Sequence, residues 1–277
     1  MPERDAGRPG PLIIIGGGED RDGERLILRE FAEAIDGGRA VLATIATEHP
    51  DDYVETYRAA FADLPIGELA VLHLDERAEA RDPETLAVLD GAAGVFFTGG
   101  DQLRISSQVG GTPLEERIRE VWLGGGVLAG TSAGASVMSD VMLVAGSART
   151  SYRIGDLRIA AGLGVLRDAV IDQHFAERGR FARLLGAVAH SPRVLGIGID
   201  EDTAIVVRGD EFTVIGSGAV YVFDAEPATS SNVAEARPDE LMSIHGVRLD
   251  VLVAGERFDL TERRPSDDVA DDDASGD

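Results

Sequence analysis

The sequence contains no cysteine and no lysine, and only 5% of its 277 residues are aromatic. The absence of cysteine excludes disulfide bonds, thiolate metal sites and a cysteine nucleophile. No stretch approaches the ~18 apolar residues of a membrane-spanning helix. The first ten residues are polar and charged, without the apolar core of a secretory signal. We therefore expect a soluble cytoplasmic protein with no membrane partner.

Charge of one sign dominates what is present. There are 50 acidic residues against 26 basic ones, which gives a formal net charge of −24, and every basic residue is arginine. Because phosphate backbones and anionic lipids repel such a chain, we expect no nucleic-acid partner and no membrane surface. The acidic, lysine-free composition is typical either of adaptation to high salt or of a GC-rich genome, and composition does not separate the two.

Short apolar stretches alternate with stretches of helical spacing through the first half of the chain. Ile27, Phe31 and Ile35, for example, recur at intervals of four and mark one helix face. This alternation predicts an α/β fold with a mainly parallel sheet, helices on both faces and a site at the carboxyl ends of the strands. The predicted strands are residues 12–15, 40–45, 69–74, 94–97 and 127–129.

The second half has a different pattern. A strand is predicted at residues 195–199, and short apolar stretches separated by glycine turns then predict an antiparallel meander within residues 204–223. We expect a single domain over residues 11–263. Residues 1–10 and an acidic tail, residues 264–277, should be disordered because they contain too few apolar residues to be anchored.

The stretch Gly130-Thr131-Ser132-Ala133-Gly134 follows an apolar strand and precedes small residues that can start a helix. This is the context of a G-x-S-x-G nucleophile elbow, in which a strained turn exposes the central side chain. Ser132 is therefore the candidate nucleophile. The N–H of Ala133, at the start of the helix, is a candidate oxyanion donor. A tight packing turn without catalytic function is the alternative.

A second glycine-rich loop follows the preceding predicted strand, in Phe97-Thr98-Gly99-Gly100-Asp101-Gln102. It should open at the same sheet edge as Ser132, so the N–H of Gly99 or Gly100 is the candidate second oxyanion donor. An ordinary strand-to-helix turn would have the same sequence.

A third glycine-rich loop begins at Gly16. It does not match the dinucleotide fingerprint G-x-G-x-x-G, because Arg21 occupies the place of the third glycine. We therefore expect no cofactor. No group of histidine and acidic residues has recognisable ligand spacing, so we also expect no metal.

A serine hydroxyl needs an adjacent base, normally a histidine held by a carboxylate. His174 follows an apolar stretch, with Asp172 and Gln173 before it and an arginine cluster after it, and it is the candidate base. A structural histidine that only hydrogen-bonds a loop is the alternative. The other histidines are His49, His73, His190 and His245.

The orienting acid is less well defined. Glu201 stands at the end of the strand predicted at residues 195–199 and can face the same edge as Ser132. Asp200, Asp202 and Asp156 are rivals, and spacing does not choose among them.

Four motifs, in order along the chain, together resemble the cyanophycinase family of serine peptidases, and the likeness runs from about residue 11 to residue 223. The motifs are Phe97-Thr98-Gly99-Gly100-Asp101-Gln102, Gly130-Thr131-Ser132-Ala133-Gly134-Ala135-Ser136, Asp172-Gln173-His174-Phe175 with Arg178-Gly179-Arg180, and Gly196-Ile197-Gly198-Ile199-Asp200-Glu201-Asp202-Thr203-Ala204.

This resemblance implies a flavodoxin-like α/β fold, related to aspartyl dipeptidases and class I glutamine amidotransferases, and a homodimer. It implies hydrolysis of cyanophycin, a polyaspartate with arginine joined to each β-carboxyl, to β-Asp-Arg dipeptides. Ser132 matches the nucleophile, His174 the base and Glu201 the orienting acid, with Ala133 and Gly100 as oxyanion donors. The positions that match the substrate pocket are Gln102, Asp172, Gln173, Arg178, Arg180 and Arg183.

Two other functions compete with this interpretation. One is a dipeptidase of the same superfamily that acts on aspartyl or isoaspartyl dipeptides. The other is a non-catalytic binding module on an amidotransferase-like fold. The chain departs from the family pattern in its lysine-free acidic composition, its acidic tail and the stretch after Phe223, which matches nothing in the motifs.

Overall fold

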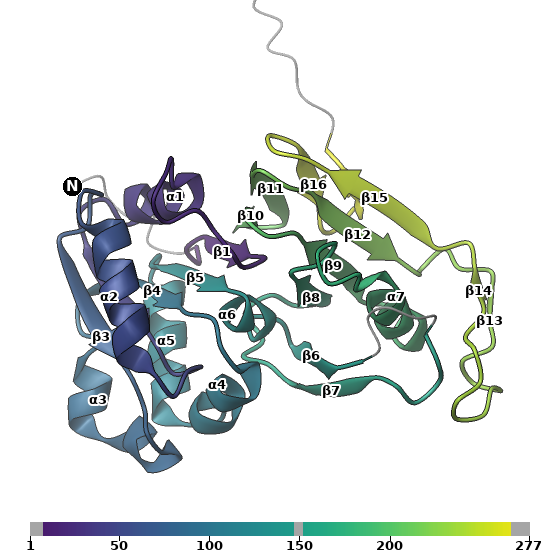
Figure 1. The fold of residues 1–277 in the computed structure, drawn as a ribbon, viewed down its shortest axis with the longest axis horizontal. Helices are drawn as coiled ribbons and strands as arrows, with labels where there is room; N and C mark the ends of the chain where they lie inside the picture. Colours follow the sequence, from purple (N-terminus) through teal and green to yellow (C-terminus); the bar gives the residue numbers. More distant parts are fainter. Residues whose placement is uncertain (1–7, 147–151, 267–277) are drawn as a thin grey trace, which may run out of the picture.

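A computed structural model describes residues 8–146 and 152–266 and shows two large sheets side by side (Figure 1). The larger sheet has nine strands, of which five parallel strands form one half and four antiparallel strands the other. The predicted α/β class, with a mainly parallel sheet, is confirmed. In spatial order the strands are β17 (Arg264–Pro265), β16 (Arg257–Asp259), β11 (Glu211–Gly216), β10 (Thr203–Arg208), β1 (Leu12–Ile15), β5 (Val127–Thr131), β4 (Ala92–Phe97), β2 (Arg39–Ala43) and β3 (Glu68–Leu72).

Helices cover both faces of the parallel half, because successive strand residues point to opposite sides. Ile13 and Ile15 pack with Phe31 and Phe96 on one face, whereas Leu12 and Ile14 belong to the core on the other. The first face carries α1 (Leu26–Ile35) and α2 (Pro50–Phe61). The second carries η1 (Arg77–Arg81), α3 (Pro83–Ala87), α4 (Gln102–Val109) and α5 (Pro113–Leu123).

The smaller sheet has four strands, and α7 (Phe181–His190) covers one of its faces (Figure 1). Leu184 and Val188 of this helix pack on Val170 and Phe223. The opposite face joins the large core of the first sheet. The strands are β15 (Arg248–Leu252), β12 (Val220–Asp224), β9 (Leu195–Ile199) and β8 (Ala169–Gln173). Between and beyond the sheets lie α6 (Ala133–Ser136) and the strand pairs β6 (Val141–Ala145) with β7 (Arg158–Ala161) and β13 (Ser230–Ser231) with β14 (Ile244–His245).

The predicted meander is divided between the two sheets, which corrects our expectation. β10 and β11 form a hairpin, but β12 pairs with β9 and not with β11. Two contacts direct the chain across: the N–H of Gly218 donates to Thr203 Oγ1, and the N–H of Ala219 donates to Asp200 Oδ2. Val220 and Val222 are thereby buried.

The stretch after Phe223 returns to both sheets. β15 extends the smaller sheet beside β12, whereas β16 adds to the larger sheet beside β11. There the rings of Phe212 and Phe258 stack with centroids 5.4 Å apart. This stretch therefore ties the two sheets together.

The expected ends of the domain differ slightly from the structure. Gly10 exchanges hydrogen bonds with Trp122, and Arg264–Pro265 pairs with β16, so these residues belong to the ordered fold. Residues 1–7 of the predicted N-terminal segment and residues 267–277 of the acidic tail lie outside the described residues. Within the described part of the chain, no helix is long and apolar enough to cross a membrane.

Candidate active site

Ser132 stands at the carboxyl end of β5 in a strained conformation, with φ 53° and ψ −106°. Its N–H donates to the carbonyl of Ile15, which ties the turn to the neighbouring strand β1. A Cβ on Gly134 would lie 2.5 Å from the carbonyl oxygen of Phe97, so only glycine fits there. The backbone therefore has the geometry of a nucleophile elbow.

The helix after the elbow is short. α6 covers only Ala133–Ser136, so it supplies little helix dipole, and oxyanion stabilisation would depend on individual N–H groups. Among the described residues, the N–H groups of Ala133 and Gly100 donate to no other group. Gly99 lies against Ser132, since a Cβ on it would be 3.6 Å from the Ser132 Cβ. Ala133 and Gly100 thus remain the proposed donors.

The side chains of Ser132, His174 and Glu201 form a connected chain of hydrogen bonds. Ser132 Oγ lies 2.9 Å from His174 Nε2, and His174 Nδ1 lies 2.6 Å from Glu201 Oε1. His174 follows β8 and Glu201 follows β9, two adjacent parallel strands. The N–H of His174 donates to the carbonyl of Gly16 over 2.7 Å, which links the smaller sheet to the larger one. The predicted nucleophile, base and acid are thus connected in the order that acyl transfer requires.

The rival acids have other partners. Asp200 accepts hydrogen bonds from the N–H groups of Ala176 and Ala219, and Asp202 accepts one from the N–H of Asp20. The side chain of Asp156 forms no hydrogen bond to His174 among the described residues. Glu201 is the carboxylate that contacts His174.

The loop Gly16–Gly18 fits against this triad, which we did not predict. A Cβ on Gly17 would overlap the His174 ring, and one on Gly18 would lie 3.1 Å from Glu201 Oε2. Three glycines after a strand indicate that the backbone closely approaches another group, but the sequence did not show that this group is the His174–Glu201 pair.

A cavity of about 460 Å³ opens beside Ser132 and His174. Gln102, Gln173, Arg178, Arg180 and Arg183 line it, together with both predicted glycines of the 99–100 loop, and no carboxylate within residues 8–146 and 152–266 does. Asp172, which we predicted in the pocket wall, is placed differently.

Asp172 lies beneath the cavity and does not line it, because its side chain is only 1% exposed. Asp172 Oδ2 accepts from Arg183 Nε over 2.6 Å, and Oδ1 accepts from Arg180 Nη1 over 3.0 Å and from Arg183 Nη2. Arg180 Nη1 also donates to Gln173 Oε1 over 2.9 Å. Asp172 therefore fixes two guanidinium groups that belong to residues lining the cavity.

Burial lowers the pKa of Arg180 to about 10, an effect that Asp172 opposes. Arg180 consequently keeps its charge at neutral pH. Gln102 is held differently, since its Nε2 donates to the carbonyl of Leu143 over 3.0 Å. The cavity wall is thus positively charged and hydrogen-bonded from behind in a protein of strongly negative net charge.

Comparisons with known proteins agree with this geometry. The model of peptidase family S51 matches residues 12–215. The chain belongs to peptidase family S51. A cyanophycinase of Synechococcus elongatus is 38% identical over 92% of this chain and 80% of its own length. A cyanophycinase of Geminocystis herdmanii is 36% identical over 92% of this chain and 95% of its own length. The resemblance stated from the four motifs is therefore confirmed.

Two solved structures share this fold. The crystal structure of a peptidase from an acI-B1 actinobacterium superposes with a TM-score of 0.69, at 25% identity, over 92% of this chain and 98% of that one. The crystal structure of a protein named putative peptidase E, from Listeria monocytogenes, shares the fold alone, with a TM-score of 0.51 and 19% identity.

The environment of His174 in this S51 peptidase lowers its pKa. Burial is the largest cause, the hydrogen bond to Glu201 opposes it, and the charges of Arg178 and Arg180 add to the lowering. A base must be unprotonated, so activity should fall only when the pH drops through this depressed pKa. We expect the acidic limb of kcat/KM against pH to have its midpoint below the ordinary histidine value of about 6.5. A midpoint above that value would contradict this assignment of the base.

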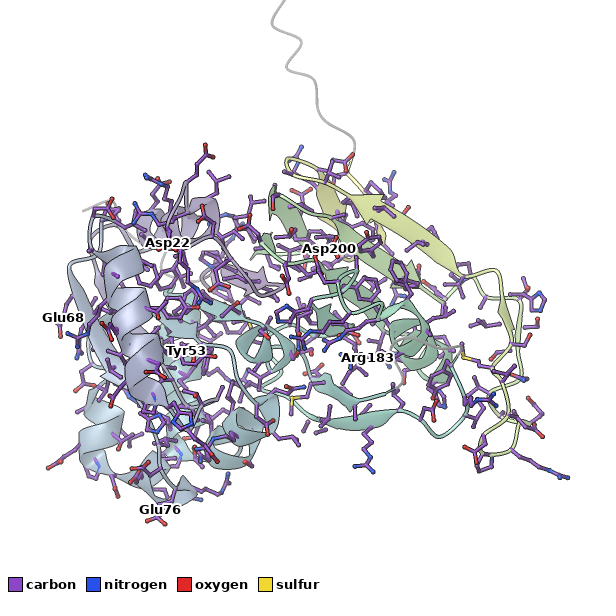
Figure 2. All side chains as sticks on the ribbon, in the orientation of Figure 1. Asp22, Tyr53, Glu68, Glu76, Arg183 and Asp200 are labelled. Atoms are coloured by element: carbon purple, nitrogen blue, oxygen red, sulfur yellow. The ribbon has the colours of Figure 1, made fainter. Side chains whose placement is uncertain are left out.

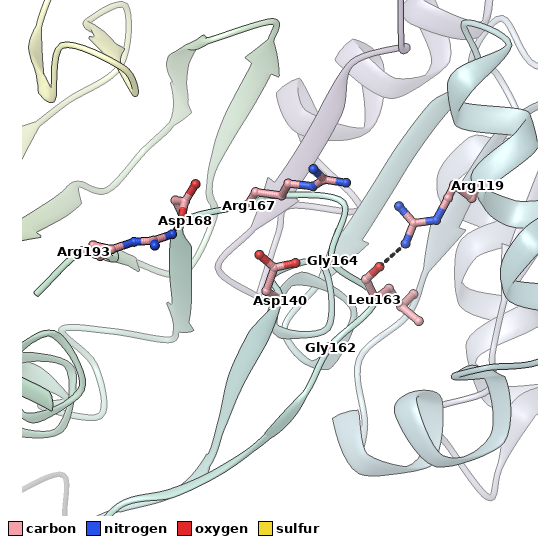
Figure 3. Close-up of a pocket in the computed structure, with 8 residues that line it drawn as sticks. All are labelled: Arg119, Asp140, Gly162, Leu163, Gly164, Arg167, Asp168 and Arg193. Atoms are coloured by element: carbon pink, nitrogen blue, oxygen red, sulfur yellow. Dashed lines mark hydrogen bonds and ion pairs between the residues drawn. The ribbon is translucent and has the colours of Figure 1, made fainter. Parts of the chain in front are cut away.

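A second cavity, of about 750 Å³, lies at the opposite end of the smaller sheet (Figure 3). It is lined by Asp168 and Arg193, which precede β8 and β9, and by Arg119, whose Nη2 donates to the carbonyl of Leu163. His174 and Glu201 follow the same two strands at their other ends. Among the described residues, no serine or histidine lines this second cavity, so it lacks a Ser–His pair, and the candidate site is the cavity at Ser132.

Proposed function

We propose that this chain hydrolyses cyanophycin to β-Asp-Arg dipeptides through an acyl-enzyme on Ser132. The observation that carries the proposal is an arginine-lined cavity directly beside a Ser132–His174–Glu201 chain of hydrogen bonds. Relatives at 36–38% identity are named cyanophycinases. Cyanophycin carries a carboxylate on every arginyl branch and at its backbone terminus, and guanidinium forks bind carboxylates in bidentate geometry.

In the acylation step, Ser132 Oγ forms a bond to the backbone carbonyl carbon of an Asp residue, and its proton passes to His174 Nε2. The carbonyl oxygen becomes an oxyanion that accepts hydrogen bonds from the N–H groups of Ala133 and Gly100. When the carbon–nitrogen bond breaks, the leaving amine takes the proton from His174. Glu201 stabilises the intermediate imidazolium and fixes the ring orientation.

In the second step, water adds to the ester carbonyl as His174 takes one of its protons. Ser132 then leaves and recovers its hydrogen from His174, which restores the free enzyme. The two steps consume one water molecule and release the terminal β-Asp-Arg unit and a shortened polymer.

The arginines of residues 178–183 are proposed to bind the carboxylates of the departing terminal unit. The side chains of Arg180 and Arg183 are only 10% and 7% exposed, and both residues line the cavity, so their charges are largely withdrawn from water. A site of this kind disfavours substrates that lack the carboxylates, because its buried donors would stay unpaired. Such a site favours a polymer with regularly spaced carboxylates over a general protein substrate.

Digestion of three substrates tests the proposal and its rivals. Cyanophycin should be cleaved to β-Asp-Arg, whereas casein and plain polyaspartate should be cleaved little or not at all. Preferred hydrolysis of free aspartyl or isoaspartyl dipeptides would favour the dipeptidase instead. Failure of a serine-directed probe to label the protein would favour the non-catalytic binding module.

We also propose that the protein is a cytoplasmic homodimer that pairs through β15. Leu249 and Val251 of this edge strand, and Val253 after it, are about half exposed, and their spacing places them on one face. An exposed apolar stripe on a strand edge favours association with a second copy. Cell fractionation tests the compartment.

The dimer proposal predicts that Val251→Asp converts a dimer to a monomer, because it buries a charge in the interface. Light scattering after size-exclusion chromatography measures the mass. Ile159→Asp is the matched control, since Ile159 is 61% exposed on β7, outside the proposed interface. A monomeric wild type, or equal effects of both substitutions, would contradict the proposal.

A further inference from the structure

A buried carboxylate lies behind the cavity on the side of α2. The Glu19 side chain is fully buried, and its Oε1 accepts from Arg21 Nη2 over 2.9 Å, from Arg21 Nε over 3.1 Å and from the Tyr57 hydroxyl. Its Oε2 accepts from Thr131 Oγ1 over 2.5 Å. A carboxylate withdrawn from water needs such partners, and Glu19 obtains them from three separate segments of the fold.

Glu19 holds Arg21 in a fixed position. The Arg21 guanidinium lies 5.0 Å from the centre of the Tyr57 ring, so it is fixed both by ion pairing and by stacking. Its Nη1 has no hydrogen-bond partner among the described residues, its side chain is 32% exposed, and it lines the active-site cavity. Arg21 therefore presents free donors from a fixed group to the cavity.

Arg21 and the cluster of arginines at residues 178–183 belong to different walls. Arg21 is packed with α2, which also contributes Tyr53 to the lining, whereas Arg183 is on α7. Figure 2 shows Tyr53 and Arg183 on elements on either side of the middle of the molecule. Ser132 belongs to the same lining and follows Thr131, the residue that Glu19 holds. The cavity thus has two separate groups of carboxylate-binding donors around one nucleophile.

We propose that Arg21 forms a second carboxylate subsite, which binds the α-carboxylate of the arginyl branch on the penultimate unit of the polymer. This inference rests on the proposed function. The arginines at residues 178–183 bind the carboxylates of the departing terminal unit. The penultimate unit acylates Ser132, so its arginyl branch lies on the other side of the scissile bond. Arg21 is the guanidinium that lines the cavity there.

The test uses two synthetic trimers of β-Asp-Arg. One has free carboxylates throughout, and in the other the branch arginine of the penultimate unit is an α-carboxamide. Wild-type enzyme should cleave the carboxamide trimer with kcat/KM about 10- to 100-fold lower, the range of a charge-assisted hydrogen bond. Arg21→Ala should lower kcat/KM on the free trimer by a similar factor. On the carboxamide trimer, the same substitution should lower kcat/KM hardly at all compared with wild type.

Equal losses by Arg21→Ala on the two trimers would overturn the subsite, and so would equal wild-type cleavage of both. Because Arg21→Ala leaves Glu19 buried without its cation, the double variant Glu19→Gln with Arg21→Gln provides a second comparison and should also show no preference. Arg21→Lys, which keeps the charge but not the fork, should recover only part of the preference. If wild-type enzyme cleaves neither trimer, the proposed function fails, which is a distinguishable result.

Discussion

Replacing Ser132 with alanine should lower hydrolysis of cyanophycin by roughly 10³-fold or more, because the acyl-enzyme route is closed. Only binding and the oxyanion donors would remain to act on a directly attacking water. The fold should persist, since among the described residues the Ser132 side chain hydrogen-bonds His174 alone, and the strained turn depends on the glycines around it. Turnover is measured as dipeptide release at saturating polymer.

The control for this substitution is Ser107→Ala, which changes an exposed serine on α4 away from the cavity. It should leave both turnover and labelling by a serine-directed probe unchanged, whereas Ser132→Ala should abolish labelling. Circular dichroism checks that both variants are folded. Near-wild-type turnover by Ser132→Ala would falsify the nucleophile assignment.

Replacing Glu201 with glutamine should lower kcat by about 10³- to 10⁴-fold, the range seen when the acid of a serine triad is neutralised. The amide keeps the size of the side chain but cannot stabilise an imidazolium. It also carries an N–H₂ group that can hold the ring in the wrong tautomer. Asp156→Asn is the matched control, because the Asp156 side chain forms no hydrogen bond to the triad in the described part of the chain, and its replacement should have little effect.

The same variant should shift the pH profile in a defined direction. Both the hydrogen bond and the charge of Glu201 raise the pKa of His174, against the larger lowering by burial. Removing the charge should therefore lower this pKa further, and the acidic limb of the residual activity should move to lower pH. A limb that moves to higher pH, or a greater loss from Asp156→Asn than from Glu201→Gln, would show that the wrong carboxylate was assigned.

Local patterns in the sequence predicted the parts of the site that one segment defines. The elbow could be predicted because a strand, two glycines and a serine specify a strained turn by themselves, and the observed φ of 53° at Ser132 agrees. The choice of acid could not be predicted in this way. Asp200, Glu201 and Asp202 are consecutive, and only the three-dimensional turn directs Glu201 to His174 and its neighbours to backbone N–H groups.

Contacts distant in sequence account for what was missed. Glu19 meets Tyr57 and Thr131 across separations of 38 and 112 residues, so nothing near Arg21 in the sequence indicated a fixed guanidinium in the cavity. Similarly, the spacing of the strands in the second half did not show that β12 would leave the hairpin for the other sheet. That outcome depends on Thr203 and Asp200, which capture the turn before β12.

Digestion of purified cyanophycin by the wild-type protein, with the products identified by mass spectrometry, tests the central claim most directly. The geometry of Ser132, His174 and the arginine-lined cavity predicts progressive release of β-Asp-Arg as the main product, with casein left intact under the same conditions. Comparable rates on casein and cyanophycin, or an undegraded polymer in the presence of an enzyme that a serine-directed probe labels, would contradict it.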